Sequence, residues 1–173
     1  GRDNLTSGIF KSSLQLLGIF SIYRITSYEK YPLFCYSVWH SKNLPKCMDK
    51  NWNLLKKNNP EITFCLYDEI DCRNFIEKNF EKEVVDAYDK LVPSSYKSDL
   101  WRFCMLYING GIYIDIKYNC VNEFKLIDIC DKEHFCMDRI NSKNETWWND
   151  NEQGIYTAVI TCKSRNKILR QCI

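Results

Sequence analysis

The sequence predicts an α/β sandwich with a largely parallel sheet, and three features support this fold class. Short apolar runs alternate with amphipathic segments of helical length from about residue 31 onward. The run "LFCYSVW" (33–39) has the length and aromatic content of a buried strand. The stretch "INGGIYIDIKYNC" (108–120) joins the clearest helix to a strand through two glycines. Open α/β sheets bind ligands at the carboxyl ends of their strands, so polar residues there are candidate site residues.

The first half of the domain alternates between strands and helices. After the strand at 33–39, we expect a helix that opens at Pro45 and runs to about Asn58. "NNPEITFCLYD" gives a turn and a second strand that ends at Asp68. "EIDCRNFIEKNF" and "EKEVVDAYDKL" predict two helices that separate at Phe80–Glu81.

The clearest helix covers residues 95–109, with Ser94 or Ser95 as the expected cap and Asn109-Gly110-Gly111 as its end. A strand at 112–118 follows directly, and its side chains alternate between two faces. One face is apolar and the other is polar: Ile112, Ile114 and Ile116 against Tyr113, Asp115 and Lys117. Further on we expect strands at 134–137 and 155–161, a polar loop through 141–153, and a helix at the end of the chain.

The chain is long enough for one domain with a sizeable core. We expect residues 1–30 to be a tail, or the remnant of an anchor or stem, and 31–173 to be the folded domain. Within the tail, 8–23 is read as a marginal amphipathic helix, and a signal-anchor remnant stays open as the alternative. The chain starts without methionine and its last helix stops before any cap, so we expect a fragment whose domain lacks its C-terminal part.

Net charge and cysteine spacing exclude several functions. A net charge of +2 favours no polyanionic partner, and the sequence has no nucleic-acid-binding motif. The ten cysteines contain no CxxC pair and there are two histidines, so we reject a zinc site and favour reduced thiols. Two glycosylation sequons, at Asn4 and Asn144, leave the secretory route open. The compartment is therefore either the cytoplasm or the Golgi and secretory lumen.

Asp99 and Arg102 lie three residues apart and share one face of the predicted helix. The tight glycine link returns the chain into the strand that carries Tyr113 and Asp115. This arrangement can bring the Asp–Arg pair and a third polar group around one pocket. Such groups provide directional acceptors and donors for sugar hydroxyls, although a surface ion pair is the simpler alternative.

The stretch "SDLWRFCMLYINGGIYIDIK" resembles the signature of the glycosyltransferases whose sugar-binding region carries a DxD motif, often grouped as glycosyltransferase family 32. It is more distantly similar to the glucosylating domains of large clostridial toxins. The pattern is S-D-x-x-R, seven residues, then G-G-x-Y-x-D-x-D, and all but its last position is present. Upstream, "CYSVWHSKNLP" and "NPEITFCLYDEIDCRNFI" look like the family's first two strands, so the resemblance covers about 31–173.

The resemblance implies a GT-A type, Rossmann-like nucleotide-sugar-binding domain. It implies transfer of a hexose from a UDP- or GDP-sugar to a glycan, lipid or protein hydroxyl, with retention of anomeric configuration. Membrane association would come from outside this chain. The alternative is a degenerate relative that binds a nucleotide sugar or glycan without transfer.

Site residues follow from the same resemblance, position by position. Trp39 matches the aromatic residue that stacks on the donor nucleobase, with a core tryptophan as the rival interpretation. The donor sugar is contacted at the positions of Ser98, Asp99 and Arg102. Tyr113 matches a residue near the sugar and phosphates, and Asp115 matches the carboxylate that contacts ribose and sugar hydroxyls. The family's first strand usually has histidine where this chain has Tyr36.

The departure at Lys117 decides what can be expected of a cofactor. In the family pattern the last aspartate binds Mn²⁺ or Mg²⁺, and Asp115 is the one motif carboxylate left to do so. A charged lysine has three donors and no lone pair, so it is no ligand. Its ammonium could instead offset the charge of the leaving diphosphate, which makes Lys117 a catalytic candidate beside Asp115. A solvent-exposed Asp115–Lys117 pair, or a site that no longer catalyses, stays open.

Overall fold

Five strands form one sheet in the computed structural model, which describes residues 31–138 and 154–173. The strands are β1 (Phe34–Val38), β2 (Thr63–Tyr67), β3 (Gly111–Ile114), β4 (His134–Met137) and β5 (Ile155–Cys162), in the spatial order β2-β1-β3-β5-β4. The tail at 1–30, the polar loop at 141–153 and both sequons, for all of which the sequence carries expectations, lie outside the described residues. The described residues all belong to one unit of the chain, Tyr31–Ile173.

Strand direction confirms the predicted class of sheet. β1 pairs in parallel with β2 and with β3, while β5 is antiparallel to both β3 and β4. Four strands therefore run in the same direction and only β5 among the described strands is reversed. The carboxyl ends of β1, β2 and β3 meet at one edge, which is the edge where α/β proteins place their ligands.

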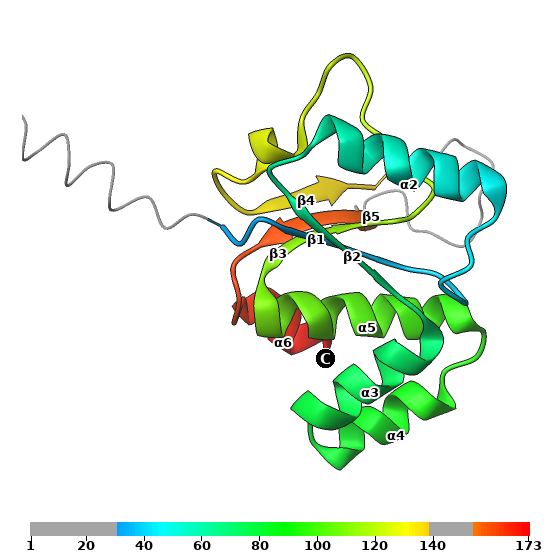
Figure 1. Ribbon diagram of the computed structural model, residues 1–173. Coiled ribbons are helices and arrows are strands. Elements are labelled where there is room, and N and C mark those ends of the chain that lie inside the picture. Colours follow the sequence, from blue (N-terminus) through cyan, green and yellow to red (C-terminus); the bar gives the residue numbers. More distant parts are fainter. Residues whose placement is uncertain (1–30, 139–153) are drawn as a thin grey trace, which may run out of the picture. The chain divides into compact units, whose positions relative to one another are not determined.

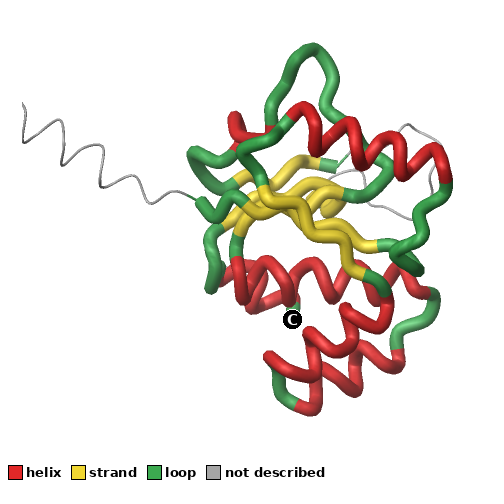
Figure 2. The backbone as a smooth tube through the Cα atoms, viewed as in Figure 1, coloured by secondary structure: helices red, strands yellow, loops and turns green. Residues whose placement is uncertain are grey.

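Helices cover both faces of the sheet, as the ribbon in Figure 1 and the backbone tube in Figure 2 show. On one face lies α2 (Lys46–Asn58), and the short η1 (Leu126–Ile129) adds to the same core. The other face carries α3 (Glu69–Asn79), α4 (Lys82–Lys90), α5 (Ser94–Asn109) and α6 (Lys167–Cys172). The helix predictions for the first half of the domain are confirmed within one or two residues at each boundary.

Two apolar cores, one on each face of the sheet, hold these layers together. On the α2 side, Ile112, Ile114 and Ile116 pack with Trp52 and Leu55, which confirms the predicted apolar face of that segment. On the α5 side, the cluster includes Tyr113 and the fully buried Trp101. Each large side chain buried here stabilises the fold by roughly 1.5–3 kcal/mol.

The junction between α5 and β3 requires two glycines. Gly110 has a φ of +65° and Gly111 a φ of +102°, values that residues with a Cβ rarely adopt. A Cβ would also lie 2.6 Å from the Ser164 nitrogen at Gly110 and 2.8 Å from the Phe34 oxygen at Gly111. The pair therefore lets the helix turn straight into the central strand.

Two local predictions were wrong. β3 ends at Ile114, not at 118, because the Tyr118 amide donates to the Asp115 carbonyl and closes a turn. Helix α5 starts at Ser94 after Pro93, without a side-chain cap, and the Ser98 hydroxyl donates to the Ser94 carbonyl instead. The shorter strand places Asp115 and Lys117 in the turn that leaves the sheet.

Surface features complete the description of the domain. All ten cysteines lie in the described residues and are free thiols; Cys35 and Cys104 are buried, whereas Cys65 is only partly buried.

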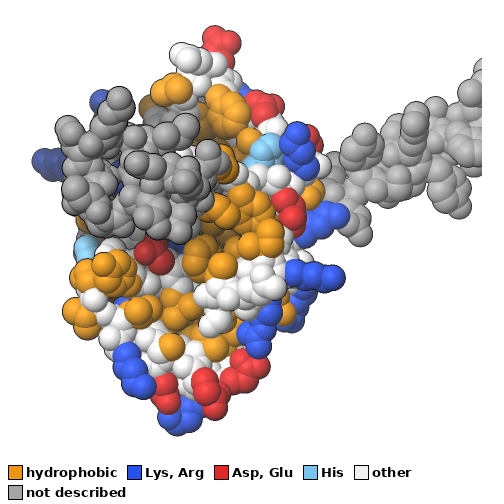
Figure 3. Space-filling model, turned by 180° about the vertical axis from the view of Figure 1, so that it is seen from behind, with side chains coloured by type: hydrophobic (Ala, Val, Ile, Leu, Met, Phe, Trp, Pro, Cys, Tyr) orange, Lys and Arg blue, Asp and Glu red, His pale blue; other side chains and the backbone are white. Residues whose placement is uncertain are grey.

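Within 31–138 and 154–173, no helix is long and apolar enough to cross a membrane. Viewed from behind, apolar side chains gather across the middle of the molecule, with charged side chains mostly around its lower and outer rim (Figure 3).

Candidate functional site

A pocket of about 390 Å³ opens where β1, β2 and β3 end and α5 begins. Every site residue predicted from the sequence lines it: Trp39, Ser98, Asp99, Arg102, Tyr113, Asp115 and Lys117. They come from three separate segments of the chain. The structure therefore brings the predicted residues together, and their roles remain proposals. We call Asp99, Arg102, Tyr113 and Asp115 the arginine end of the pocket.

Arg102 is the centre of the arginine end. Its side chain is 7% exposed, and its Nη2 lies 2.7 Å from the Asp99 carboxylate. Nη1 donates to the carbonyl (2.7 Å) and hydroxyl (3.1 Å) oxygens of Thr157 on β5, and lies 3.6 Å from Asp115. Nε donates to the Ser98 carbonyl at 3.3 Å. The guanidinium is thus bound to the protein on three sides, which fits positioning two carboxylates better than binding a ligand directly.

Tyr113 contacts both Arg102 and Asp115 and so helps to hold them in place. Its ring lies under the Arg102 guanidinium, 4.4 Å from ring centre to the guanidinium carbon, which is a cation–π contact. Its hydroxyl donates to Asp115 Oδ1 at 2.8 Å. Burial, more than any neighbouring charge, raises the pKa of the Tyr113 phenol, so the phenol keeps its proton and acts as a donor.

The two carboxylates of the arginine end differ in exposure: the side chain of Asp99 is 45% exposed and that of Asp115 is 24% exposed. Burial raises the pKa of Asp99 above its usual value even though Arg102 opposes the shift, and the negative charge of Asp115 adds to it. The Asp115 amide donates to the Ala158 carbonyl at 2.9 Å, which fixes its backbone to β5. Both carboxylates are held in place before any ligand arrives, which is the arrangement that binds hydroxyl groups with least reorganisation.

The residues present do not fit a divalent metal held by the motif. Lys117, with no lone pair to offer, occupies the second motif position, and its Nζ lies 3.7 Å from Asp115 Oδ2. Across the described parts of the chain, no cluster of three or more His, Cys, Asp or Glu side chains could hold a metal ion. Asp115 is the one motif carboxylate left for Mg²⁺ or Mn²⁺, and its two oxygens already contact the Tyr113 hydroxyl and the Lys117 ammonium.

A second group of residues that line the pocket, which we call the tryptophan end, consists of Trp39, His40 and Glu69. Trp39 and His40 follow β1, and Glu69 is the first residue of α3 after β2. His40 Nδ1 lies 2.9 Å from Glu69 Oε1, and its ring meets the Trp39 indole edge-on at 4.9 Å. The hydrogen bond from His40 is the largest cause that lowers the pKa of Glu69.

Sequence reasoning missed several residues of this pocket. Glu69 and His40 could have been found, because both stand directly beyond the carboxyl end of a parallel strand. No sequence pattern could have identified Thr157, because it lies 55 residues from Arg102, the residue that it contacts. Tyr36, at the position where a histidine was noted as usual, is buried in the core.

Comparison with known proteins identifies the family of this chain. Residues 23–147 match a family described as the glycosyltransferase sugar-binding region containing a DXD motif. An uncharacterized glycosyltransferase of Acanthamoeba polyphaga mimivirus is 41% identical over 54 residues, which are 31% of this chain and 22% of that protein. The inositol phosphoceramide mannosyltransferase 1 of Schizosaccharomyces pombe is 23% identical over 95 residues, or 53% of this chain and 30% of that protein.

The chain therefore spans less than a third of the length of either curated relative. Among solved structures, the PaToxG glycosyltransferase aligns with 92% of this chain and 66% of its own, at 14% identity and a TM-score of 0.49.

Proposed function

Because the chain belongs to the family of glycosyltransferases with a DXD-containing sugar-binding region, we propose that it transfers a hexose from a nucleotide sugar to a hydroxyl group. The donor is a UDP- or GDP-sugar, and the acceptor is a glycan, lipid or protein hydroxyl. The name of the S. pombe relative, a mannosyltransferase, supports a hexose as the transferred group. Transfer with retention of anomeric configuration is part of the proposal.

One observation carries this function: two carboxylates from different elements are fixed by a single buried arginine at the ligand-binding edge of the sheet. Asp99 comes from α5 and Asp115 follows β3, and Arg102 contacts both. Carboxylate oxygens accept hydrogen bonds from adjacent sugar hydroxyls, and an arginine–carboxylate network holds them without a bound ligand. We assign the donor sugar to Ser98, Asp99 and Asp115.

Arg102 and Tyr113 act as positioning residues in this scheme. Each bonds to Asp115, and Arg102 also bonds to Asp99. Trp39 lines the other end of the pocket, where a flat aromatic ring can stack on a nucleobase. The donor would thus lie with its sugar at the arginine end and its base at the tryptophan end.

The reaction needs little covalent chemistry from the protein. The bond between the anomeric carbon and the diphosphate oxygen breaks, and its electron pair leaves with the diphosphate. The acceptor oxygen bonds to the anomeric carbon, and its proton is passed to the departing diphosphate. The chain's contribution is the orientation of donor and acceptor and the stabilisation of the leaving charge.

The second candidate is a protein that binds the nucleotide sugar without transferring it. Lys117 in the motif favours this candidate, because a carboxylate is lost where the family motif has one. Both candidate functions predict binding of a nucleotide sugar, so only catalytic turnover of the donor distinguishes them.

The test is release of nucleoside diphosphate from a panel of UDP- and GDP-sugars, with Mn²⁺ and with EDTA. Release that rises with a hydroxyl acceptor supports the transferase. Binding of a nucleotide sugar without release across a panel of acceptors supports the binding protein. Absence of binding to every donor contradicts both.

A further inference from the structure

The strongest further feature is the side chain at the second aspartate position of the family motif. Lys117 occupies that position, two residues after Asp115. Its side chain is 60% exposed and lines the pocket. The following inference rests on the proposed function, because it concerns the diphosphate of the same donor.

Two contacts hold the Lys117 ammonium near the motif without enclosing it. Nζ lies 3.7 Å from Asp115 Oδ2 and 5.3 Å from the centre of the Tyr118 ring. The first distance is longer than a hydrogen bond, so the three N–H donors of the ammonium are not used up by Asp115. The charge therefore stays accessible from the pocket.

Among the described residues that line the pocket, Arg102 and Lys117 carry a permanent positive charge. Arg102 is 7% exposed, lies against both carboxylates and donates to Thr157, so its charge is balanced inside the protein. Lys117 is the one of the two that can turn toward a ligand. A nucleoside diphosphate carries negative charge that must be met by such a group.

We propose that Lys117 is the built-in cation of the donor site, and that this chain binds a nucleoside diphosphate without a divalent metal. The ammonium donates hydrogen bonds to the diphosphate oxygens. When the bond to the anomeric carbon breaks, the electron pair stays on the diphosphate and Lys117 stabilises the charge while keeping its own proton. No group is oxidised or reduced.

The surroundings of Asp115 also disfavour a metal. Asp115 Oδ1 accepts the Tyr113 hydroxyl at 2.8 Å, and Oδ2 faces Lys117. A divalent cation on Asp115 would displace one of these partners or lie beside the ammonium, where like charges repel. The lysine thus supplies positive charge and raises the cost of binding a metal at the same place.

The experiment measures binding of UDP and GDP to the full chain by calorimetry, in EDTA and in Mn²⁺. We expect one of the two to bind in EDTA, with an affinity that Mn²⁺ changes less than about threefold. In EDTA, Lys117→Met should weaken binding about tenfold to a hundredfold, the loss expected for a charge-assisted contact. The same Lys117→Met substitution should weaken binding of the corresponding nucleoside monophosphate less than binding of the diphosphate, because fewer phosphate oxygens reach the lysine.

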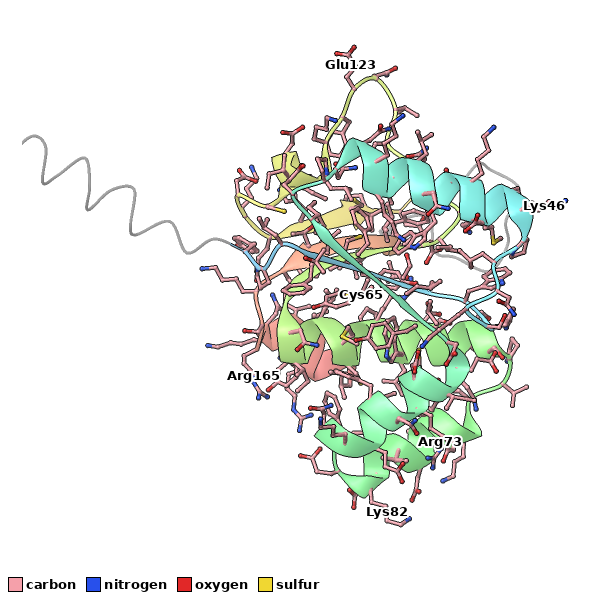
Figure 4. The ribbon with its side chains drawn as sticks, in the orientation of Figure 1. Lys46, Cys65, Arg73, Lys82, Glu123 and Arg165 are labelled. Carbon is pink, nitrogen blue, oxygen red and sulfur yellow. The ribbon has the colours of Figure 1, made fainter. Side chains whose placement is uncertain are left out.

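Matched variants separate this role from a structural one. Lys117→Arg keeps the charge and should retain most of the affinity. Lys82→Met is the control, because Lys82 is also exposed and paired with an aspartate, Asp86, but lies on α4 at the far end of the molecule (Figure 4). Lys117→Asp restores two motif carboxylates and should bind the diphosphate tightly only when Mn²⁺ is present. Thermal unfolding checks that each variant is folded.

Three results would overturn the inference. If the unmodified chain binds the diphosphate only when Mn²⁺ is present, the inference is wrong and the proposed function stands. If Lys117→Met and the unmodified chain bind the diphosphate equally well in EDTA, the inference is also wrong. Failure of the unmodified chain to bind either diphosphate under any condition would overturn the proposed function together with the inference.

Discussion

The arginine end and the tryptophan end of the same pocket are built in opposite ways. Arg102 is 7% exposed and bonds to three segments of the chain, namely its own helix, the turn after β3, and β5. The side chains of His40 and Glu69 are 66% and 50% exposed and are joined by one hydrogen bond. One end is a buried polar network, and the other is a pair of surface side chains beside an indole.

This difference indicates which part of the ligand each end can select. A network that is already bonded cannot rearrange cheaply, so the arginine end presents a fixed set of acceptors. An exposed pair has little to lose when it moves, so the tryptophan end can adjust to the base it stacks on. The predictions below test this contrast from the largest expected effect to the smallest.

Replacing the buried arginine should have the largest effect on stability. Arg102→Met leaves Asp99 and Asp115 without their shared partner and removes the donor to Thr157. Removing one partner from a fully buried ion pair costs about 3–5 kcal/mol of unfolding free energy; because Asp99 and Asp115 are 45% and 24% exposed, we expect a loss of about 2–3 kcal/mol here. Chemical denaturation measures this loss directly.

The matched control is Arg73→Met. Arg73 on α3 (Figure 4) also contacts two carboxylates, Asp89 and Glu77, but it is 42% exposed and does not line the pocket. Its loss should cost under about 1 kcal/mol. Equal losses at Arg102 and Arg73 would mean that burial of the network is unimportant.

The next effect concerns catalysis. Asp115→Asn keeps the shape and an acceptor for the Tyr113 hydroxyl, but removes the negative charge toward the sugar. We expect turnover to fall about 10²–10³-fold, the size found when one fixed transition-state contact is removed. Release of nucleoside diphosphate gives the rate, and thermal unfolding shows whether the fold is kept. Full activity in this variant would remove Asp115 from its assigned role.

The contrast also explains how much the sequence could predict. Asp99, Arg102, Tyr113 and Asp115 lie within 17 residues on one helix and the strand that follows, so local spacing and the glycine pair were enough to place them together. The sequence did not predict the reversed direction of β5, because nothing local sets the direction in which a strand joins its neighbours in a sheet. Thr157 depends on that strand, so its bond to Arg102 was invisible in the sequence.

The end of β3 illustrates a second kind of failure. Alternating isoleucines predicted the buried face correctly through Ile116, yet the hydrogen-bonded strand stops at Ile114. Side-chain burial continues after the backbone has turned, because Ile116 still reaches the α2-side core. Periodicity reports which side chains are buried, and backbone pairing is a separate matter.

At the tryptophan end, Trp39 should matter for binding more than for stability. Trp39→Ala removes the stacking surface, and loss of one base–aromatic contact costs about 1–3 kcal/mol, or roughly tenfold to a hundredfold in affinity. Trp39→Phe keeps an aromatic ring and should retain part of the affinity that Trp39→Ala loses. Because the indole also packs against the α2-side core, unfolding is measured alongside nucleotide binding. A loss of stability with unchanged affinity would identify Trp39 as a core residue.

The smallest effect is expected from Glu69, and its dependence on pH gives it a clear signature. The pKa of Glu69 is lowered from its usual 4.5, first by the hydrogen bond from His40 and against the opposing effect of burial. A carboxyl whose pKa is lower in the folded state stabilises the fold above its usual pKa, and this contribution is lost as the pH falls through the folded value.

Glu69→Gln should therefore cost under about 1 kcal/mol near neutral pH, because both partners are half exposed or more, and the difference should vanish once the pH falls below the lowered pKa of Glu69. Denaturation at several pH values measures it, with Glu83→Gln, an exposed glutamate on α4, as the control for net charge. A loss that persists at acid pH would mean that the glutamate acts through packing rather than charge. A loss as large as that of Arg102→Met would mean that the two ends of the pocket are equally rigid, and the proposed division between fixed sugar contacts and an adjustable base site would fail.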